Sequence, residues 1–313
     1  MDNLNTSKTV SIQFYVVSYI DILGQTSELS KWDMVPNEAK KSPEFEPEVF
    51  QCLSRIRDLN KYYTHLLKSN DPVTKFDYSP QEGGIFKLRH ISDAVIAYSP
   101  ITINDGETTT MPAFRLLLSS AFLMLDYLAQ GIPIRGGISI GFGTDSDDFG
   151  GFYGPALARA YYLESKKSRY PRILVCDRFM SFLNSKVFCR DNKKNIVYQK
   201  IAAECINLIK TNNTENELNY ADASVWKHRP QEDKVIIRDL IKHAYSFAMN
   251  EVSARNADAD EIYKKYVELL AYLSYCAETF GYNLSDLDKN VKNGSLTTLP
   301  RVIKTRFTSS SSH

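Results

Sequence analysis

The chain has 313 residues and a mass of 35.7 kDa, enough for one large domain or for a domain with an extension. Hydrophobic residues make up 43% and charged residues 24%, as is usual for globular proteins. Because 38 Lys and Arg face 37 Asp and Glu, the net charge is +1, which argues against the broad basic field of a nucleic-acid-binding protein.

The five cysteines are scattered without a CxxC pair. Their spacing argues against a zinc site or a disulfide framework and favours a reducing compartment. No apolar run approaches the roughly 20 residues that a membrane helix needs, and residues 1–9 lack a signal-peptide core. We therefore expect a cytoplasmic protein without membrane contact or a nucleic-acid partner.

The first strong strand pattern is the β-branched and aromatic run from Tyr15 to Ile20, which ends at Asp21. A buried run that ends on a carboxylate needs a group that holds the charge. A second run, Leu88–Tyr98, carries a comparable carboxylate at Asp93. If the two strands are neighbours, Asp21 and Asp93 face one another across a divalent cation. The alternatives are a strand-end cap for Asp21 and an ordinary Ser-Asp hairpin bend for Asp93.

The first half of the chain predicts a helix, a hairpin and a second helix after the first strand. Pro47 suits the first turn of a helix that extends to about Lys68. Residues 84–91 and 94–99 predict a tight hairpin with Asp93 at its bend. Pro112 opens a helix that is too apolar for the surface, so we expect it to pack on the sheet.

The next segments predict a strand over 132–141, a mobile glycine- and aspartate-rich tip over 143–151, and a helix from Pro155 to about Lys166. A short buried strand follows at 172–176. This order predicts an α+β fold, with a mostly antiparallel sheet and helices on one face.

Beyond residue 210 the pattern changes from mixed to helical. Residues 211–215 are linker-like in composition, and two long helical patterns follow over 232–251 and 258–280. We therefore expect a domain over 1–210, a C-terminal helical extension over 211–307 and a disordered serine-rich tail over 308–313.

Four short motifs occur in order: Asp21-Ile22-Leu23-Gly24, Ile91-Ser92-Asp93-Ala94-Val95, RGGISIG at 135–141 and YGPALARA at 153–160. Together they resemble the catalytic domain of class III nucleotide cyclases, which has a ferredoxin-like fold. The resemblance covers roughly residues 10–200. The GPAL…RAYxLE helix and the YPRILV strand look most like the pyrimidine nucleotide cyclases of the Pycsar anti-phage systems, which make cyclic UMP or cyclic CMP.

The resemblance implies a metal-dependent cyclase that converts UTP or CTP to the 3′,5′-cyclic monophosphate and pyrophosphate. It implies two divalent ions, Mn²⁺ or Mg²⁺, held by Asp21, Asp93 and the Ile22 carbonyl. Oxygen ligands of this kind suit both metals. It also implies a binding site for the triphosphate, formed by the backbone of Leu23, Gly24 and Gln25 and by the side chain of Arg135.

Several positions depart from the family pattern. Arg89 stands where purine-specific cyclases have a base-reading lysine, and Gly151 stands where they have its aspartate partner, which favours a pyrimidine base. Ala158 replaces the asparagine that contacts the ribose. Tyr162 occupies the position of the transition-state arginine, and Arg159, on a similar helix face, is the alternative catalytic residue.

The resemblance further implies a head-to-tail homodimer with shared active sites. Its product would be a second messenger for a separate cyclic-nucleotide-responsive effector. Other interpretations stay open: an adenylate or guanylate cyclase with an unusual base pocket, a degenerate nucleotide-binding module, or an unrelated α+β domain with a helical tail. In the structural alternatives, Arg135 forms an edge-strand ion pair, and Gly136-Gly137 forms a bulge or a site of close helix packing.

Overall fold

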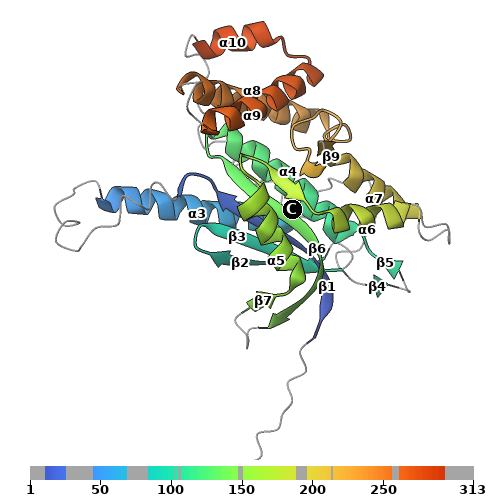
Figure 1. Ribbon diagram of the computed structural model, residues 1–313. Coiled ribbons are helices and arrows are strands. Elements are labelled where there is room, and N and C mark those ends of the chain that lie inside the picture. The colour runs from blue at the N-terminus through green and yellow to red at the C-terminus, as the bar shows by residue number, and fades with distance from the viewer. Residues whose placement is uncertain are drawn as a thin grey trace, which may run out of the picture.

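The computed structural model (Figure 1) describes most of the chain and shows an α+β fold. The described residues are 11–25, 45–68, 84–101, 103–104, 107–146, 151–187, 196–212, 214–255 and 261–292. The serine-rich tail that we expected to be disordered lies outside them.

A mixed, mostly antiparallel open sheet forms the centre, in the order β2-β3-β1-β6-β8-β10-β9. Among the described strands, only β6 and β8 run parallel to each other, and β7 pairs with the far end of β6. The described strands of this sheet are β1 (Gln13–Ile22), β2 (Lys87–Ile91), β3 (Ala94–Pro100), β6 (Ile134–Ser146), β7 (Gly151–Tyr153), β8 (Ile173–Val175), β9 (Ile209–Asn212) and β10 (Glu215–Leu218). A separate small hairpin joins β4 (Ile103–Asn104) and β5 (Glu107–Thr108).

The helices lie on both sides of this sheet and beyond one end of it (Figure 1). They are α3 (Phe45–Lys68), α4 (Met111–Ala129), α5 (Pro155–Tyr162), the π-helix η3 (Leu163–Lys167), α6 (Asp177–Val187), α7 (Ile196–Asn207), α8 (Gln231–Ser253), α9 (Glu261–Thr279) and α10 (Leu284–Lys292).

The prediction that helices cover one face is wrong. Strand β1 buries both of its faces: Val16, Ile20 and Ile22 join a large hydrophobic cluster with α3 and α4, whereas the odd-numbered residues from Tyr15 to Tyr19 join a second cluster with α5. Successive side chains of a strand point to opposite faces, so a strand with apolar residues on both faces needs cover on both sides.

Helix α4 is the core of the larger cluster. Pro112 lies in its first turn as predicted, and nearly every residue of the helix is buried. Contrary to our expectation from the sequence, α4 is long and apolar enough to cross a membrane, the only such helix in the described ranges. However, 94% of its apolar window is buried inside the protein, as in a core helix.

Two segments that we expected to be irregular belong to the sheet. Strand β6 continues to Ser146 and pairs with β7, so residues 143–146 are not a mobile tip. Of the linker-like residues, Thr211 and Asn212 belong to β9 and Glu215 begins β10, which pairs with both β9 and β8. The expected division at residue 210 therefore falls within a hairpin, and residues of α8 and α9 share the larger hydrophobic cluster with α4.

Gly137 lets α5 approach β6 closely. A Cβ atom at this position would lie 2.1 Å from the Ala160 carbonyl oxygen and 2.7 Å from the Leu163 Cβ. Neither contact can relax without moving the helix, because both involve backbone or backbone-proximal atoms. Of the two interpretations left open for this glycine pair, close helix packing therefore holds for Gly137.

We expect Gly137→Ala to lower the free energy of unfolding by about 2–3 kcal/mol, because it forces α5 away from the sheet. Urea denaturation followed by circular dichroism measures this loss. Gly281→Ala is the control: Gly281 has φ +78 with nothing within 4 Å of an added Cβ, so only backbone strain of about 1 kcal/mol is expected there. Equal losses in the two variants would show that the α5–β6 contact tolerates a methyl group.

Candidate active site

Asp21 and Asp93 meet at one end of the sheet. In the antiparallel register of β1 and β3, Asp21 lies opposite Ala94, the neighbour of Asp93. Ser92 and Asp93 form the two-residue bend between β2 and β3, with Ile91 paired to Ala94. Ser92 has a φ of 56°, as the tight turns of two-residue hairpins require. The predicted hairpin and the predicted proximity of the two carboxylates are thus both present.

Arg135 and Glu164 complete this cluster of charges. Arg135 is paired with Asp21 across β1 and β6, and its Nη2 lies 3.2 Å from Asp21 Oδ2. Its Nε lies 2.7 Å from Oε1 of Glu164, a side chain of η3 that is only 3% exposed. One guanidinium therefore bridges two carboxylates, and we call Asp21, Asp93, Arg135 and Glu164 the carboxylate cluster. Arg135 is not a simple edge-strand ion pair, because β6 is an interior strand.

The carboxylate cluster holds more negative charge than Arg135 neutralises. Burial and the Asp93 charge raise the pKa of Asp21 to about 6, against the opposing effect of Arg135. Burial raises the pKa of Glu164 to about 7, again against Arg135 and with the help of Asp21 and Asp93. A positive ion near these oxygens would reduce the repulsion between them.

The turn after β1 carries a buried amide without a hydrogen-bond partner. Gly24 has a φ of +90°, a conformation that favours glycine. Gln25 is 2% exposed, and neither atom of its side-chain amide has a hydrogen-bond partner. A buried amide without a partner costs free energy unless a bound group satisfies it. By contrast, the Leu23 N–H donates to the Pro133 carbonyl at 2.9 Å, so it is not available to a phosphate as we had expected.

The predicted base-reading residues form a second group, at the other end of the same face. Arg89 lies beside Gly151, where an added Cβ would be 3.6 Å from the Arg89 Nε. Asp145 of β6, missed in the sequence, lies there too: its Oδ1 accepts from the Tyr98 hydroxyl at 2.8 Å and lies 3.8 Å from Arg89 Nη2. Lys87 is 2.6 Å from its other oxygen. We call Lys87, Arg89, Tyr98 and Asp145 the arginine group.

Asp145 is held as an anion. Burial alone would raise the pKa of this carboxyl group, but Lys87, Tyr98 and Arg89 together hold the pKa below its ordinary value. Val17 is paired with Tyr98 and lies four positions before Asp21 on β1. At the rise of an extended strand, the backbone of Tyr98 therefore lies about 13 Å further along the sheet than that of Asp21.

Within one chain, neither Arg159 nor Tyr162 lies at the carboxylate cluster or at the arginine group. The Arg159 guanidinium donates to the Ile140 carbonyl at 2.8 Å, and Ile140 is paired with Val16, five residues from Asp21. Tyr162 is half exposed at the end of α5.

No model of a known protein family matches the chain, and a search of curated proteins finds no significant match. In the described part of the chain, moreover, no three or more His, Cys, Asp or Glu side chains form a group that could hold a metal ion. A cation at Asp21 and Asp93 would therefore need further ligands, such as the Ile22 carbonyl, water or a phosphate.

We expect the metal-free protein to lose stability as the pH rises from about 4 to about 7. The folded pKa values of Asp21 and Glu164 lie above their ordinary values, so the folded state binds protons more tightly, and this stabilisation is lost as the pH passes through 6 and 7. Asp21→Asn should reduce the decline and raise the free energy of unfolding at pH 8 by about 1 kcal/mol. Denaturant titrations in EDTA at several pH values test this. Asp286→Asn, at an exposed position, is the control, and an unchanged pH profile in Asp21→Asn would contradict the prediction.

Proposed function

We propose that the protein is a metal-dependent nucleotide cyclase that converts a pyrimidine nucleoside triphosphate, UTP or CTP, to the 3′,5′-cyclic monophosphate and pyrophosphate. One observation carries the proposal: Asp21 at the end of β1 and Asp93 at the β2–β3 bend lie together. This arrangement of strand, hairpin and paired carboxylates is the one that the motif resemblance to class III cyclases implies.

The donor set fits two divalent ions of the Mg²⁺ or Mn²⁺ type. Asp21, Asp93 and the Ile22 carbonyl offer the oxygen ligands that hard cations prefer, and such ions keep places for water and phosphate. The raised pKa of Asp21 has its cause in burial and in the nearby Asp93 charge. When bound, the ions would supply charge neutralisation for the triphosphate and for the attacking ribose oxygen.

The residues of the chain itself position the substrate. Arg135, fixed between Asp21 and Glu164, offers a forked donor at the edge of the carboxylate cluster, where a triphosphate would lie. The Gln25 amide supplies an unpaired donor and acceptor at the turn after β1. Glu164 orients Arg135, which leaves Asp21 and Asp93 as the metal-facing carboxylates.

A pyrimidine base suits the arginine group. The pairing edges of uracil and of cytosine each present acceptors in excess of donors, whereas guanine presents the reverse. Arg89 is a forked donor and Asp145 is an ionised acceptor, so together they complement an edge of the pyrimidine kind. Because Asp145 supplies an acid, the absence of an acid at Gly151 no longer excludes a purine base. The preference for a pyrimidine therefore rests on the excess of hydrogen-bond donors over acceptors in the arginine group.

The positions of the two groups favour a homodimer with shared sites. They lie at opposite ends of one face, and α5 covers the sheet between them, with Tyr161 packed edge-on against Tyr19. A head-to-tail copy would place the arginine group of one protomer against the carboxylate cluster of the other. Tyr153, Tyr161 and Tyr162 are at least half exposed there and offer apolar area for the contact.

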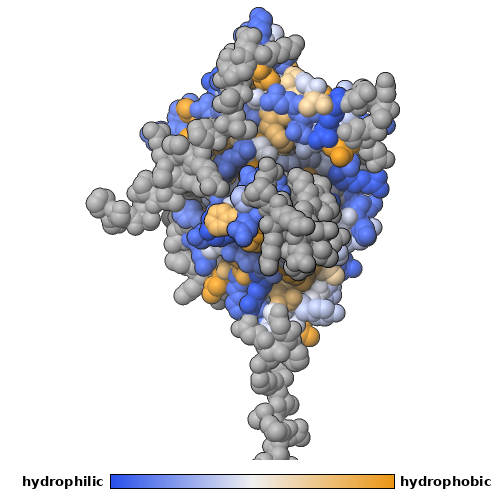
Figure 2. Space-filling model, turned by 90° about the vertical axis from the view of Figure 1, so that its left-hand side faces the viewer, coloured by the Kyte–Doolittle hydropathy of each residue, from blue (hydrophilic) through white to orange (hydrophobic). Residues whose placement is uncertain are grey.

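Figure 2 shows the side toward which α3 points, and its hydrophobic residues appear there as separate spots among hydrophilic ones. We place the proposed dimer contact on the face of α5 because of the exposed tyrosines on that face.

The biological setting of the proposal follows from the resemblance. The cyclic nucleotide would act as a second messenger for a separate effector in anti-phage defence, within the cytoplasm. The four free cysteines of the described ranges are all buried, as is usual for a reducing compartment.

One observation favours a second candidate, a nucleotide-binding module without turnover. The Arg159 guanidinium is engaged by the Ile140 carbonyl, and Ala158 and Tyr162 replace two residues that active members of the family use. Calorimetry would then show binding of a nucleoside triphosphate in the absence of any cyclic product.

The direct test is incubation of the purified protein with Mn²⁺ and each of the four nucleoside triphosphates, with products separated by liquid chromatography. We expect cyclic UMP or cyclic CMP as the main product. Asp21→Ala should lower kcat/KM by at least about a hundredfold, because it removes a metal ligand. The exposed Asp286→Ala serves as control. Full activity of Asp21→Ala, or no product from any nucleotide, would refute the proposal.

Mixing two inactive variants tests the shared site. Asp21→Ala damages the carboxylate cluster, and Arg89→Ala damages the arginine group at the other end of the face. If each site uses one group from each protomer, an equal mixture should recover roughly a quarter of the wild-type activity, because half of the dimers are mixed and each has one intact site. Asp21→Ala mixed with Asp93→Ala is the negative control, since both changes lie in one group. Recovery by neither mixture would place both groups of a site in the same chain.

A further inference from the structure

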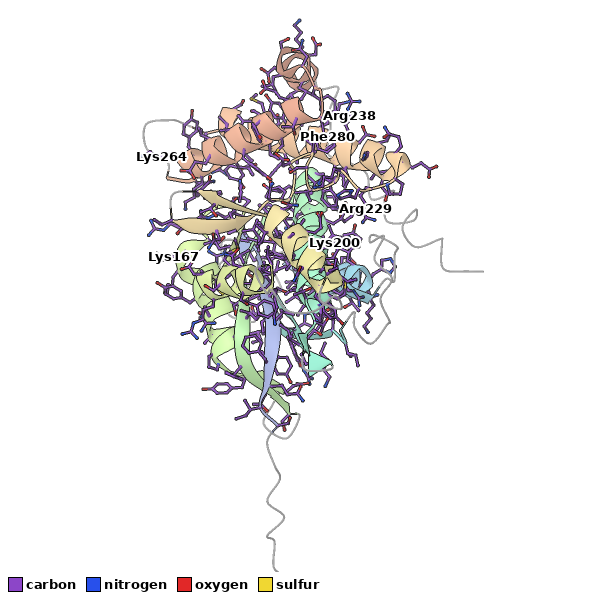
Figure 3. All side chains as sticks on the ribbon, turned by 90° about the vertical axis from the view of Figure 1, so that its right-hand side faces the viewer. Lys167, Lys200, Arg229, Arg238, Lys264 and Phe280 are labelled. Atoms are coloured by element: carbon purple, nitrogen blue, oxygen red, sulfur yellow. The ribbon has the colours of Figure 1, made fainter. Side chains whose placement is uncertain are left out.

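A cavity of about 660 Å³ lies between the β8–β10–β9 edge of the sheet and helix α9, away from both groups described above. Figure 3 shows this side: Lys264 projects from α9, and Lys167 marks the end of η3, with strands of the sheet edge between them. The volume lies within the range of small-molecule sites. Its described lining includes Arg169, Tyr170, Arg172, Lys210, Glu215, Glu217, Tyr220, Lys264, Lys265, Glu268 and Tyr272.

Polar groups at the bottom of the cavity lack hydrogen-bond partners. Tyr220 is fully buried, and its hydroxyl group makes no hydrogen bond. Oε2 of Glu217, a side chain that is 4% exposed, has none either. An unsatisfied buried hydroxyl costs about 1–3 kcal/mol, and a phenylalanine would fill the same space without that cost. The fold alone gives no reason for a tyrosine at this position, whereas a bound group with N–H or O–H donors does.

The charges of the cavity favour an anion at its mouth. Five cationic side chains and three carboxylates occur among the lining residues. Two of the cations, Arg172 and Lys210, lie against Glu217 at 4.0 Å and 3.3 Å and serve to hold that carboxylate. The others, Arg169, Lys264 and Lys265, lie nearer the surface, where a phosphate could reach them from solvent.

We infer that this cavity binds a small organic phosphate that carries N–H or O–H donors at its other end. The phosphate contacts Arg169, Lys264 and Lys265, and the donors reach Tyr220 and Glu217. A nucleoside monophosphate and a phosphorylated sugar both have this chemistry. The walls include Tyr170 and Tyr272, whose ring faces already carry Arg172 and Lys210 at 4.5 Å and 3.3 Å, so these rings and cations form a fixed frame for the ligand.

Arg172 connects this cavity to the carboxylate cluster. Its Nη2 donates to the Lys167 carbonyl at the end of η3, the helix that carries Glu164. Its own carbonyl accepts from the Gly136 N–H, next to Arg135. A ligand that shifts Arg172 therefore acts on both partners of the Arg135–Glu164 contact. Regulation of turnover through this route rests on the proposed cyclase function, whereas binding in the cavity does not.

Isothermal titration calorimetry on the full chain in EDTA tests the binding, because EDTA removes the divalent ions that nucleotide binding at the carboxylate cluster would need. The probes are UMP, AMP, ribose 5-phosphate, uridine and inorganic phosphate. We expect an organic phosphate to bind more tightly than uridine or inorganic phosphate. Comparison of UMP and AMP with ribose 5-phosphate shows whether the ligand is a nucleoside monophosphate or a phosphorylated sugar.

Tyr220→Phe is the decisive variant. It should weaken binding by about tenfold, while the melting temperature of the free protein stays the same or rises, because only an unpaired hydroxyl is lost. Lys264→Glu with Lys265→Glu should also weaken binding, and Lys200→Glu, on α7 away from the cavity (Figure 3), should not. Absence of binding by all the organic phosphates, or binding that neither cavity variant changes, would overturn the inference. Neither result depends on whether the protein is a cyclase.

Discussion

Strand β1 is hydrogen-bonded to β3 on one side and to β6 on the other, and this double pairing fixes the carboxylate cluster. In its register Asp21 lies opposite Ala94 and opposite Arg135. A slip of one residue would turn Asp21 toward α4 and the hydrophobic core, where its charge would have no partner. The apolar residues on both faces of β1 prevent such a slip, because each face packs against its own helices. Burial of the strand thus holds the charged end in place.

The close contact of α5 with β6 likewise fixes the position of Glu164. Gly137 leaves no side chain between strand and helix. The chain then continues from α5 into the π-helix η3, a wider turn that is often found at functional sites, and Glu164 lies in its first turn. Glu164 reaches Arg135 from there. The resulting cluster is less stable in its ionised form than in its protonated form, as the raised pKa values of Asp21 and Glu164 indicate. Metal-free stability is therefore reduced at the pH at which a cation would bind.

Local patterns in the sequence correctly predicted the elements that depend on interactions between residues close together in the chain. The helix opened by Pro112 and the hairpin bend at Asp93 follow from backbone preferences and periodicity, and both are present. The role of α5 in covering the second face was missed, although the apolar odd-numbered positions of β1 carried the signal. Glu164 and Asp145 had no local signal, because their partners are far away in the sequence. The engagement of the Leu23 N–H by Pro133 likewise depends on a tertiary contact.

The π-helix also links the two halves of the chain. Its Glu164 contacts Arg135 of β6, and the carbonyl at its end accepts a hydrogen bond from Arg172, which in turn pairs with Glu215 of β10 at 2.8 Å. The strand that carries Glu215 also carries Glu217, whose partner Lys210 lies over the ring of Tyr272 in α9. Ion pairs, one hydrogen bond to a backbone carbonyl and one cation–π contact, joined by short stretches of chain, therefore connect the carboxylate cluster to helix α9. A buried ion pair that loses one partner leaves the other charge unpaired. A change at α9 can therefore alter the stability of the contacts that hold Arg135. The C-terminal helices are, on this view, part of what keeps the carboxylate cluster in order.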